Sequence, residues 1–139
     1  MKCTAIRLMF ATAVVAVVTS VASAQTMKAD IPFAFRFGKE MYPAGTYRVQ
    51  VQGPYSTVRI SNLETRHDAV MLVTSTETPA AAWRATGAPV MAFECGLGRC
   101  QLTQIWAGFD RPALSLPHPR LGRDEVATLR VVHLSQVSD

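Results

Sequence analysis

Two cysteines stand five positions apart in "FECGLGRCQL", residues 93–102, and their type and spacing allow three kinds of chemistry. Redox pairs of the thioredoxin type have two residues between the cysteines and lie at a helix N-terminus, whereas four residues separate Cys95 from Cys100. Structural zinc sites need four ligands, and His118 and His133 are distant and isolated in the sequence. We therefore predict a disulfide across a β-hairpin, with a free or metal-bound pair as the alternative.

The other polar residues do not form a recognisable catalytic pattern. His67 and Asp68 are neighbours in the sequence, and adjacent residues of a strand point to opposite faces of a sheet. The methionines outside the first 24 residues are spread over four segments, without the close clustering of a soft-metal site: Met27, Met41, Met71 and Met91. We expect a protein that is not an enzyme and that has no metal or cofactor.

Three arginines favour an anion-binding face. Arg36, Arg48 and Arg59 alternate with apolar residues in three successive predicted strands, so they should point outward as a cationic stripe. Guanidinium groups suit phosphate and carboxylate because their donors form a fork. The competing interpretation is an ordinary solvated face, balanced by acidic residues: Asp30, Glu40 and Glu64.

Residues 1–24 have the three parts of a secretory signal peptide. Lys2 and Arg7 precede an apolar run, and Ala22-Ser23-Ala24 forms a cleavage pattern. That run is shorter than the roughly 20 residues of a membrane-spanning helix, and no later segment is long enough. We predict export to the periplasm or the exterior, which are oxidising compartments.

Cleavage would also change the balance of charge and of cysteines. It would remove Cys3, leaving an even pair. It would reduce the formal charge from +4 to +2, so nucleic-acid binding loses its main support.

Residues 25–139 have the two-residue period of β-strands. In "TYRVQVQ", Tyr47, Val49 and Val51 alternate with polar residues, and "STVRISN" continues the pattern. "DIPFAFRFG" alternates in the same way and is predicted to be one strand, whereas "AVMLV" is apolar on both faces and is predicted to be a central strand.

About seven strands, bounded by turn residues, predict an all-β single domain: an antiparallel sandwich or a barrel. The connection "STETPAAAWRATGA" is predicted to be a loop with one helical turn.

The ordered motifs IPFAFRFG, PAGTYRV, VRISNLET, VMAFE and LTQIWAG resemble a family of small uncharacterised exported bacterial proteins. This resemblance implies a β fold and an envelope location, and it transfers no catalytic residues. Residues 43–47, PAGTY, also resemble a turn that leads into a strand in prealbumin-like sandwich modules. In such a turn the ring of Tyr47 would pack on the opposite sheet.

Two functions from different classes remain. The first is an envelope module that binds another envelope protein or an anionic polymer. The second is a small-ligand carrier with an apolar cavity lined by inward phenylalanines: Phe33, Phe35, Phe37 and Phe93. Trp83 and Trp106 are candidates to stack on a sugar, although packing over the end of the sandwich is the commoner role.

The cysteine hairpin can be given a register. If residues 96–99 form the tip, Phe93 lies opposite Leu102 and Met91 lies opposite Gln104. Trp106 should then share the apolar face of Leu102.

Overall fold

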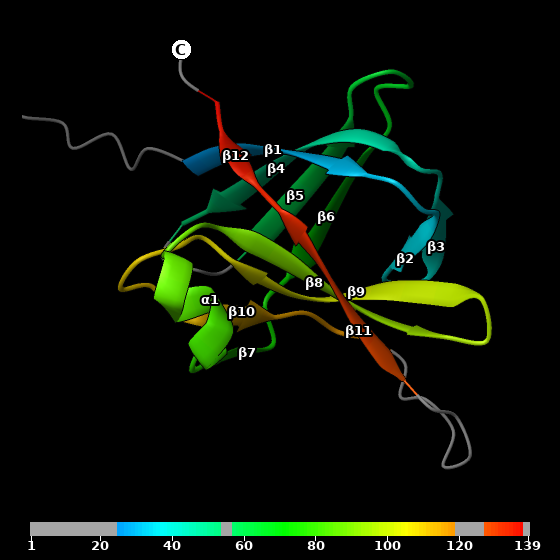
Figure 1. The fold of residues 1–139 in the computed structure, drawn as a ribbon. Coiled ribbons are helices and arrows are strands. Elements are labelled where there is room, and N and C mark those ends of the chain that lie inside the picture. Colours follow the sequence, from blue (N-terminus) through cyan, green and yellow to red (C-terminus); the bar gives the residue numbers. More distant parts are fainter. Residues whose placement is uncertain (1–24, 54–56, 119–126, 138–139) are drawn as a thin grey trace, which may run out of the picture.

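The computed structural model describes residues 25–53, 57–118 and 127–137, in which two β-sheets pack face to face (Figure 1). The predicted signal peptide, residues 1–24, lies outside the described residues. The first sheet has the order β12-β1-β4-β5-β6, and its strands are Ser135–Gln136 (β12), Gln25–Ile31 (β1), Gly45–Gln52 (β4), Thr57–Asn62 (β5) and Asp68–Leu72 (β6).

The second sheet has the order β11-β8-β9-β10-β7, and β2 and β3 extend it beside β9. Its strands are Thr128–His133 (β11), Val90–Gly96 (β8), Arg99–Trp106 (β9), Ala113–Ser115 (β10), Ser75–Glu77 (β7), Phe35–Phe37 (β2) and Glu40–Tyr42 (β3). The predicted sandwich is confirmed, and it is not a closed barrel.

Two details of the predicted sheets were wrong. The described residues contain twelve strands rather than about seven, because five of them have only two or three residues and show no periodicity in the sequence. The sheets are also not purely antiparallel, since β2 pairs with β9 in parallel, with Arg36 beside Gln101.

The segment DIPFAFRFG is not one strand. Ile31 ends β1 in the first sheet, and Phe35 begins β2 in the second sheet, so the chain crosses between the layers at residues 32–34. Ile31, Phe35 and Phe37 are all buried nevertheless, because each faces the space between the sheets from its own layer. The alternation in this segment therefore correctly predicted which side chains are buried, but the prediction of one continuous strand was wrong.

The strand β6 lies at an edge of the first sheet, not at its centre. Met71 packs against the core, whereas Val70 and Leu72 are exposed on the outer face. Apolar residues on both sides of this strand therefore do not reflect burial on both sides. The C-terminal strands join the layers again, since β11 pairs with β8 and β12 pairs with β1 along one diagonal path (Figure 1).

Aromatic rings fill the space between the sheets. Tyr47 of the first sheet packs edge-on against Phe35 of the second, with ring centroids 5.1 Å apart. The hydroxyl of Tyr47 donates to the carbonyl oxygen of Pro43, 2.6 Å away, and so fixes the turn before β4. The predicted packing of this tyrosine on the opposite sheet is confirmed. Phe93 completes the cluster by packing edge-on against both Phe33 and Phe35.

A second, smaller core lies on the outer face of the second sheet. The helix α1, Ala81–Thr86, is the predicted helical turn, and it places Trp83 over Trp106 with ring centroids 6.5 Å apart. The helix ends at Gly87, whose φ of 68° closes the C-cap. Val90, Ala92 and Ala113 bury their side chains beneath this pair.

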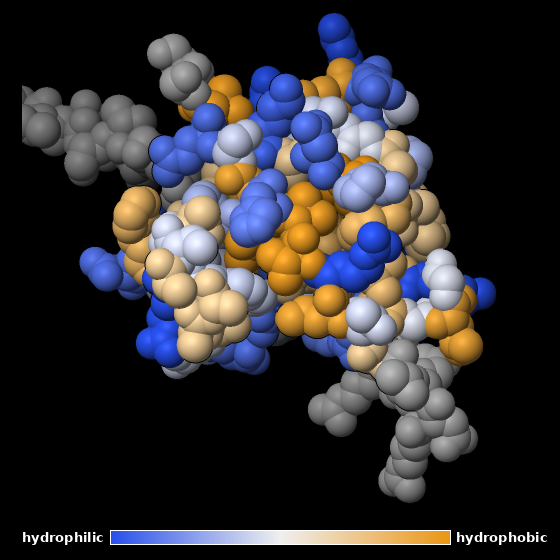
Figure 2. All heavy atoms as spheres, in the orientation of Figure 1, coloured by the Kyte–Doolittle hydropathy of each residue, from blue (hydrophilic) through white to orange (hydrophobic). Residues whose placement is uncertain are grey.

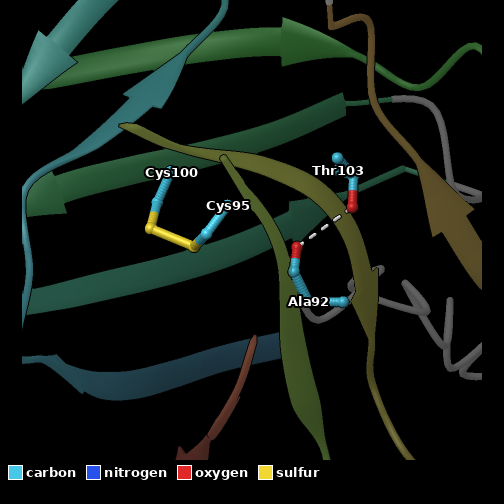
Figure 3. The surroundings of a disulfide bond; sticks show 4 residues. All are labelled: Ala92, Cys95, Cys100 and Thr103. Carbon is cyan, nitrogen blue, oxygen red and sulfur yellow. Dashed lines mark hydrogen bonds between the residues drawn. A yellow bond between two sulfur atoms is a disulfide. The ribbon is translucent and has the colours of Figure 1, made fainter. Parts of the chain in front are cut away.

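The hairpin of β8 and β9 carries the cysteines (Figure 3). Cys95 lies directly opposite Cys100, and Phe93 lies opposite Leu102 with both side chains in the main core, as predicted. The turn is tighter than predicted: only Leu97 and Gly98 lie outside the strands. Both have positive φ, 52° and 74°, as a two-residue hairpin turn of the primed type requires.

Beyond this turn the predicted register fails. A β-bulge between Ala92 and Phe93 inserts Thr103 into β9, so Met91 lies opposite Ile105 rather than Gln104. Because Thr103 is one extra residue in β9, the residues after it face the sheet sides opposite to those that strict alternation from Leu102 predicts. Ile105 consequently joins the main core, and Trp106 turns to the outer cluster under α1.

Candidate functional site

Three arginines meet in a groove of about 490 Å³ on the outer face of the first sheet. Arg48 projects from β4, Arg59 from β5 and Arg66 from the connection between β5 and β6. Asp68 also lines it. We call this feature the cationic groove.

Strand pairing brings two of the arginines together. Arg48 lies opposite Ser61, and Arg59 lies opposite Gln50, so the two arginines are diagonal neighbours on one face of β4 and β5. Such diagonal positions are about 7–8 Å apart, within reach of long side chains. Their apolar neighbours Val49 and Ile60 face the core, which leaves the two arginine side chains on the outer face of the sheet.

The third arginine is placed by a turn built around Asn62. The buried side-chain oxygen of Asn62 accepts hydrogen bonds from the backbone amides of Glu64 and Thr65, at 2.8 and 3.0 Å. The amide of Arg66 donates to the carbonyl of Asn62, 2.8 Å away. Arg66 has a φ of 59°, a left-handed conformation that non-glycine residues seldom adopt. Arg66 is not among the arginines predicted from the sequence, although Asn62 is recognisable there as a turn residue.

The groove has an excess of positive charge that no ion pair within the described residues neutralises. Among the described residues, the ion pairs within 4.0 Å are those of His67 with Glu40 and of His118 with Glu94, and they include no arginine of the groove. The Nε atom of Arg59 is inaccessible to solvent and has no hydrogen-bond partner. Three guanidinium groups against one carboxylate suit an anionic ligand.

The predicted stripe of three arginines is wrong in one member. Arg36 lies on β2 in the second sheet, paired with Met41 of β3 and Gln101 of β9, and does not line the groove. The prediction assumes that the three strands are neighbours in one sheet, but the crossing at residues 32–34 places Arg36 in the other sheet. Lys28 of β1 lies opposite Arg48 and extends the positive face instead.

His67 forms its ion pair with Glu40, not with its sequence neighbour Asp68. Its Nε2 atom lies 3.4 Å from Oε2 of Glu40. The ring of His67 also contacts Tyr42, with centroids 5.5 Å apart, and the Tyr42 hydroxyl donates to the same carboxylate oxygen at 3.1 Å. Burial, followed by this hydrogen bond and the charge of Glu40, raises the pKa of Tyr42 to about 12. Both His67 and Glu40 are exposed, so this contact ties β3 to the β5–β6 connection at the surface.

The cysteine pair forms a disulfide, with Cα atoms 4.0 Å apart. Cys100 is buried in the main core and Cys95 is half-buried against it. The bond crosses two strands that are already paired. Its position is that of a structural crosslink at the end of a hairpin (Figure 3).

Neither tryptophan is available to stack on a sugar. Trp83 is 7% exposed and Trp106 is fully buried, and the indole Nε1 of Trp106 donates to the carbonyl of Arg111 at 2.7 Å. Both rings stabilise the outer cluster under α1, which is the alternative role considered from the sequence.

Comparison with known protein families, with curated proteins and with solved structures found no match. The family resemblance of the sequence motifs therefore stays a prediction. In the part of the chain that the structure describes, no helix has the length and apolar character needed to cross a membrane.

Proposed function

We propose that this protein is an exported, non-catalytic module of the bacterial cell envelope that binds anionic polymer through the cationic groove. The observation that carries the proposal is the meeting of Arg48, Arg59 and Arg66 in one groove without an ion pair to any of them among the described residues. Export is the prediction from residues 1–24 and the family resemblance, and the disulfide is compatible with it.

The spread of positive charge over neighbouring strands favours an extended ligand. The lining residues of the groove come from β4, β5, the β5–β6 connection and the first residue of β6, and Lys28 continues the positive charge onto the neighbouring strand β1. Phosphate and carboxylate groups repeated along a polymer could contact several guanidinium groups at once. Each contact is screened by solvent and weak, so affinity would come from their number.

The alternative function, a carrier with an apolar cavity, has less support. Phe93 contacts Phe33 and Phe35 edge-on, with ring centroids 4.9 and 5.5 Å away, so these rings pack together and do not surround a cavity. Phe37 packs against Tyr42 in the same manner, at 6.2 Å. These contacts are typical of a solid aromatic core.

The test is a titration of the full chain with polyphosphate and with polygalacturonate, which carry the two candidate anionic groups. We expect binding at low ionic strength that weakens as salt is added, because charges are screened over about 8 Å at physiological salt. Arg48→Ala/Arg59→Ala/Arg66→Ala should weaken binding about tenfold, if each screened contact contributes about 0.5 kcal/mol.

The matched control is Arg36→Ala, which removes an arginine of the other sheet. It should bind both polymers as the wild type does. Equal affinity of the wild type and the triple variant would contradict the proposal. A loss of affinity in Arg36→Ala as large as that in the triple variant would place the binding site elsewhere.

A further inference from the structure

A second groove, of about 510 Å³, lies at the opposite layer of the sandwich and shares no lining residue with the cationic groove. Three segments line it: residues 76–79 at the end of β7, Arg84 of α1, and residues 109–112 between β9 and β10. We call it the Phe109 groove. These segments are adjacent because β7 and β9 both pair with β10, and α1 packs over the end of β9.

Phe109 is held in an unfavourable position. Its side chain is 76% exposed, and its φ is 53°, a conformation that is rare for a bulky residue and costs free energy. It is the second residue of a β-turn in the connection between the antiparallel strands β9 and β10, which the amide of Arg111 closes by donating to the carbonyl of Gly108 at 3.3 Å. A positive φ at this position is one that glycine adopts most easily. A bulky aromatic residue at a turn position that favours glycine, exposed at a groove, points to a role in binding.

Contacts with α1 fix this conformation. The Phe109 amide donates to the carbonyl of Gly87 at 3.4 Å, and the hydrogen bond from Trp106 to the Arg111 carbonyl closes the loop. A Cβ at Gly108 would lie 2.8 Å from the Gly87 carbonyl oxygen, so only glycine fits there. The aromatic ring lies against Gly87, where an added Cβ would be 3.7 Å from it. The loop therefore presents a pre-oriented ring.

The charges around Phe109 balance, unlike those of the cationic groove. Arg84 and Arg111 line the groove together with the carboxylates of Glu77 and Asp110. Glu77 is oriented by a hydrogen bond from the side-chain amide of Gln104 at 2.7 Å. A ligand with a net charge of either sign would meet like charge here. A neutral ligand would not be repelled in this way. Its hydroxyl groups could hydrogen-bond to the arginine donors and the carboxylate acceptors, and an apolar face could pack on the ring of Phe109.

We propose that the Phe109 groove binds a neutral sugar unit of a glycan. The C–H face of the sugar ring stacks on Phe109, and its hydroxyl groups hydrogen-bond to Glu77, Asp110 and Arg84. This site is independent of the cationic groove, and Phe109 takes the sugar-stacking role for which the sequence offers Trp83 and Trp106 as candidates.

The test is calorimetric titration of the full chain with three neutral hexasaccharides: chitohexaose, cellohexaose and maltohexaose. At least one should bind, with an affinity that does not change with salt because the ligand has no charge. Phe109→Ala should weaken this binding about tenfold, whereas Phe109→Trp should retain it because stacking survives. The ring is mostly exposed, so both variants should keep the melting temperature of the wild type.

Leu97→Ala is the matched control, because Leu97 is 80% exposed and also has a positive φ, but it lies at the cysteine hairpin. It should bind the sugar as the wild type does. The triple arginine variant of the cationic groove should do so as well, which separates the two proposals. Equal affinity of Phe109→Ala and the wild type, or no binding of any of the three hexasaccharides, would overturn the proposal.

Discussion

Thr103 donates its side-chain hydroxyl to the backbone carbonyl of Ala92, 3.2 Å away, at the point where β9 has one residue more than β8 (Figure 3). This buried hydrogen bond fastens the bulge that separates two stretches of opposite alternation. On one side Leu102 faces the main core, and on the other Ile105 does so in place of Gln104.

We expect Thr103→Val, which keeps the shape and removes the donor, to lower the free energy of unfolding by about 1 kcal/mol. Deletion of Thr103 removes the extra residue and leaves Gln104 opposite Ala92 and Ile105 opposite Met91, so Ile105 should stay in the main core and Trp106 under α1. Urea denaturation followed by tryptophan fluorescence measures both. A deletion variant that does not fold, or whose folded-state tryptophan fluorescence shows that Trp106 has left its buried site, would contradict this account of the bulge.

The disulfide should stabilise the domain without defining its fold. Because it closes a loop of only a few residues between strands already paired, Cys95→Ala/Cys100→Ala should lose about 2 kcal/mol of unfolding free energy. Circular dichroism should show unchanged strand content at a lower melting temperature. Wild type treated with reductant is the control and should lose a similar amount. A double variant that melts at the wild-type temperature would contradict this expectation.

The domain should lose stability in alkali through Tyr42. Burial and the contact with Glu40 raise its pKa from 10.0 to about 12, so between these values the unfolded chain ionises while the folded protein stays neutral. The free energy of unfolding is thus unaffected below about pH 10 and falls as the pH rises toward 12.

Denaturation curves at a series of pH values check this prediction, with Tyr42→Phe as the comparison. The variant should show a shallower decline. Its free energy of unfolding should still fall somewhat with rising pH, because burial also raises the pKa of Tyr47. A variant that declines as steeply as the wild type would mean that Tyr42 does not cause the effect.

The local features of the fold were readable from the sequence. Alternation in TYRVQVQ predicted the buried face of β4, because side chains of a strand point to opposite faces whatever it pairs with. Cys95 facing Cys100, and Phe93 facing Leu102, also followed from spacing alone, because a tight turn fixes the register of the residues beside it.

Tertiary structure decided which of these local features meet. Arg48 and Arg59 were placed outward correctly, but only the crossing at residues 32–34 moves Arg36 to the other sheet, and only the Asn62 turn brings Arg66 to the groove. Periodicity reports whether a side chain faces the core, and it contains no information on which layer the strand joins. Likewise the extra residue Thr103 is invisible in a pattern of period two, because the bulge exists only where β9 pairs with β8, and that pairing determines whether Trp106 faces the main core or lies under α1.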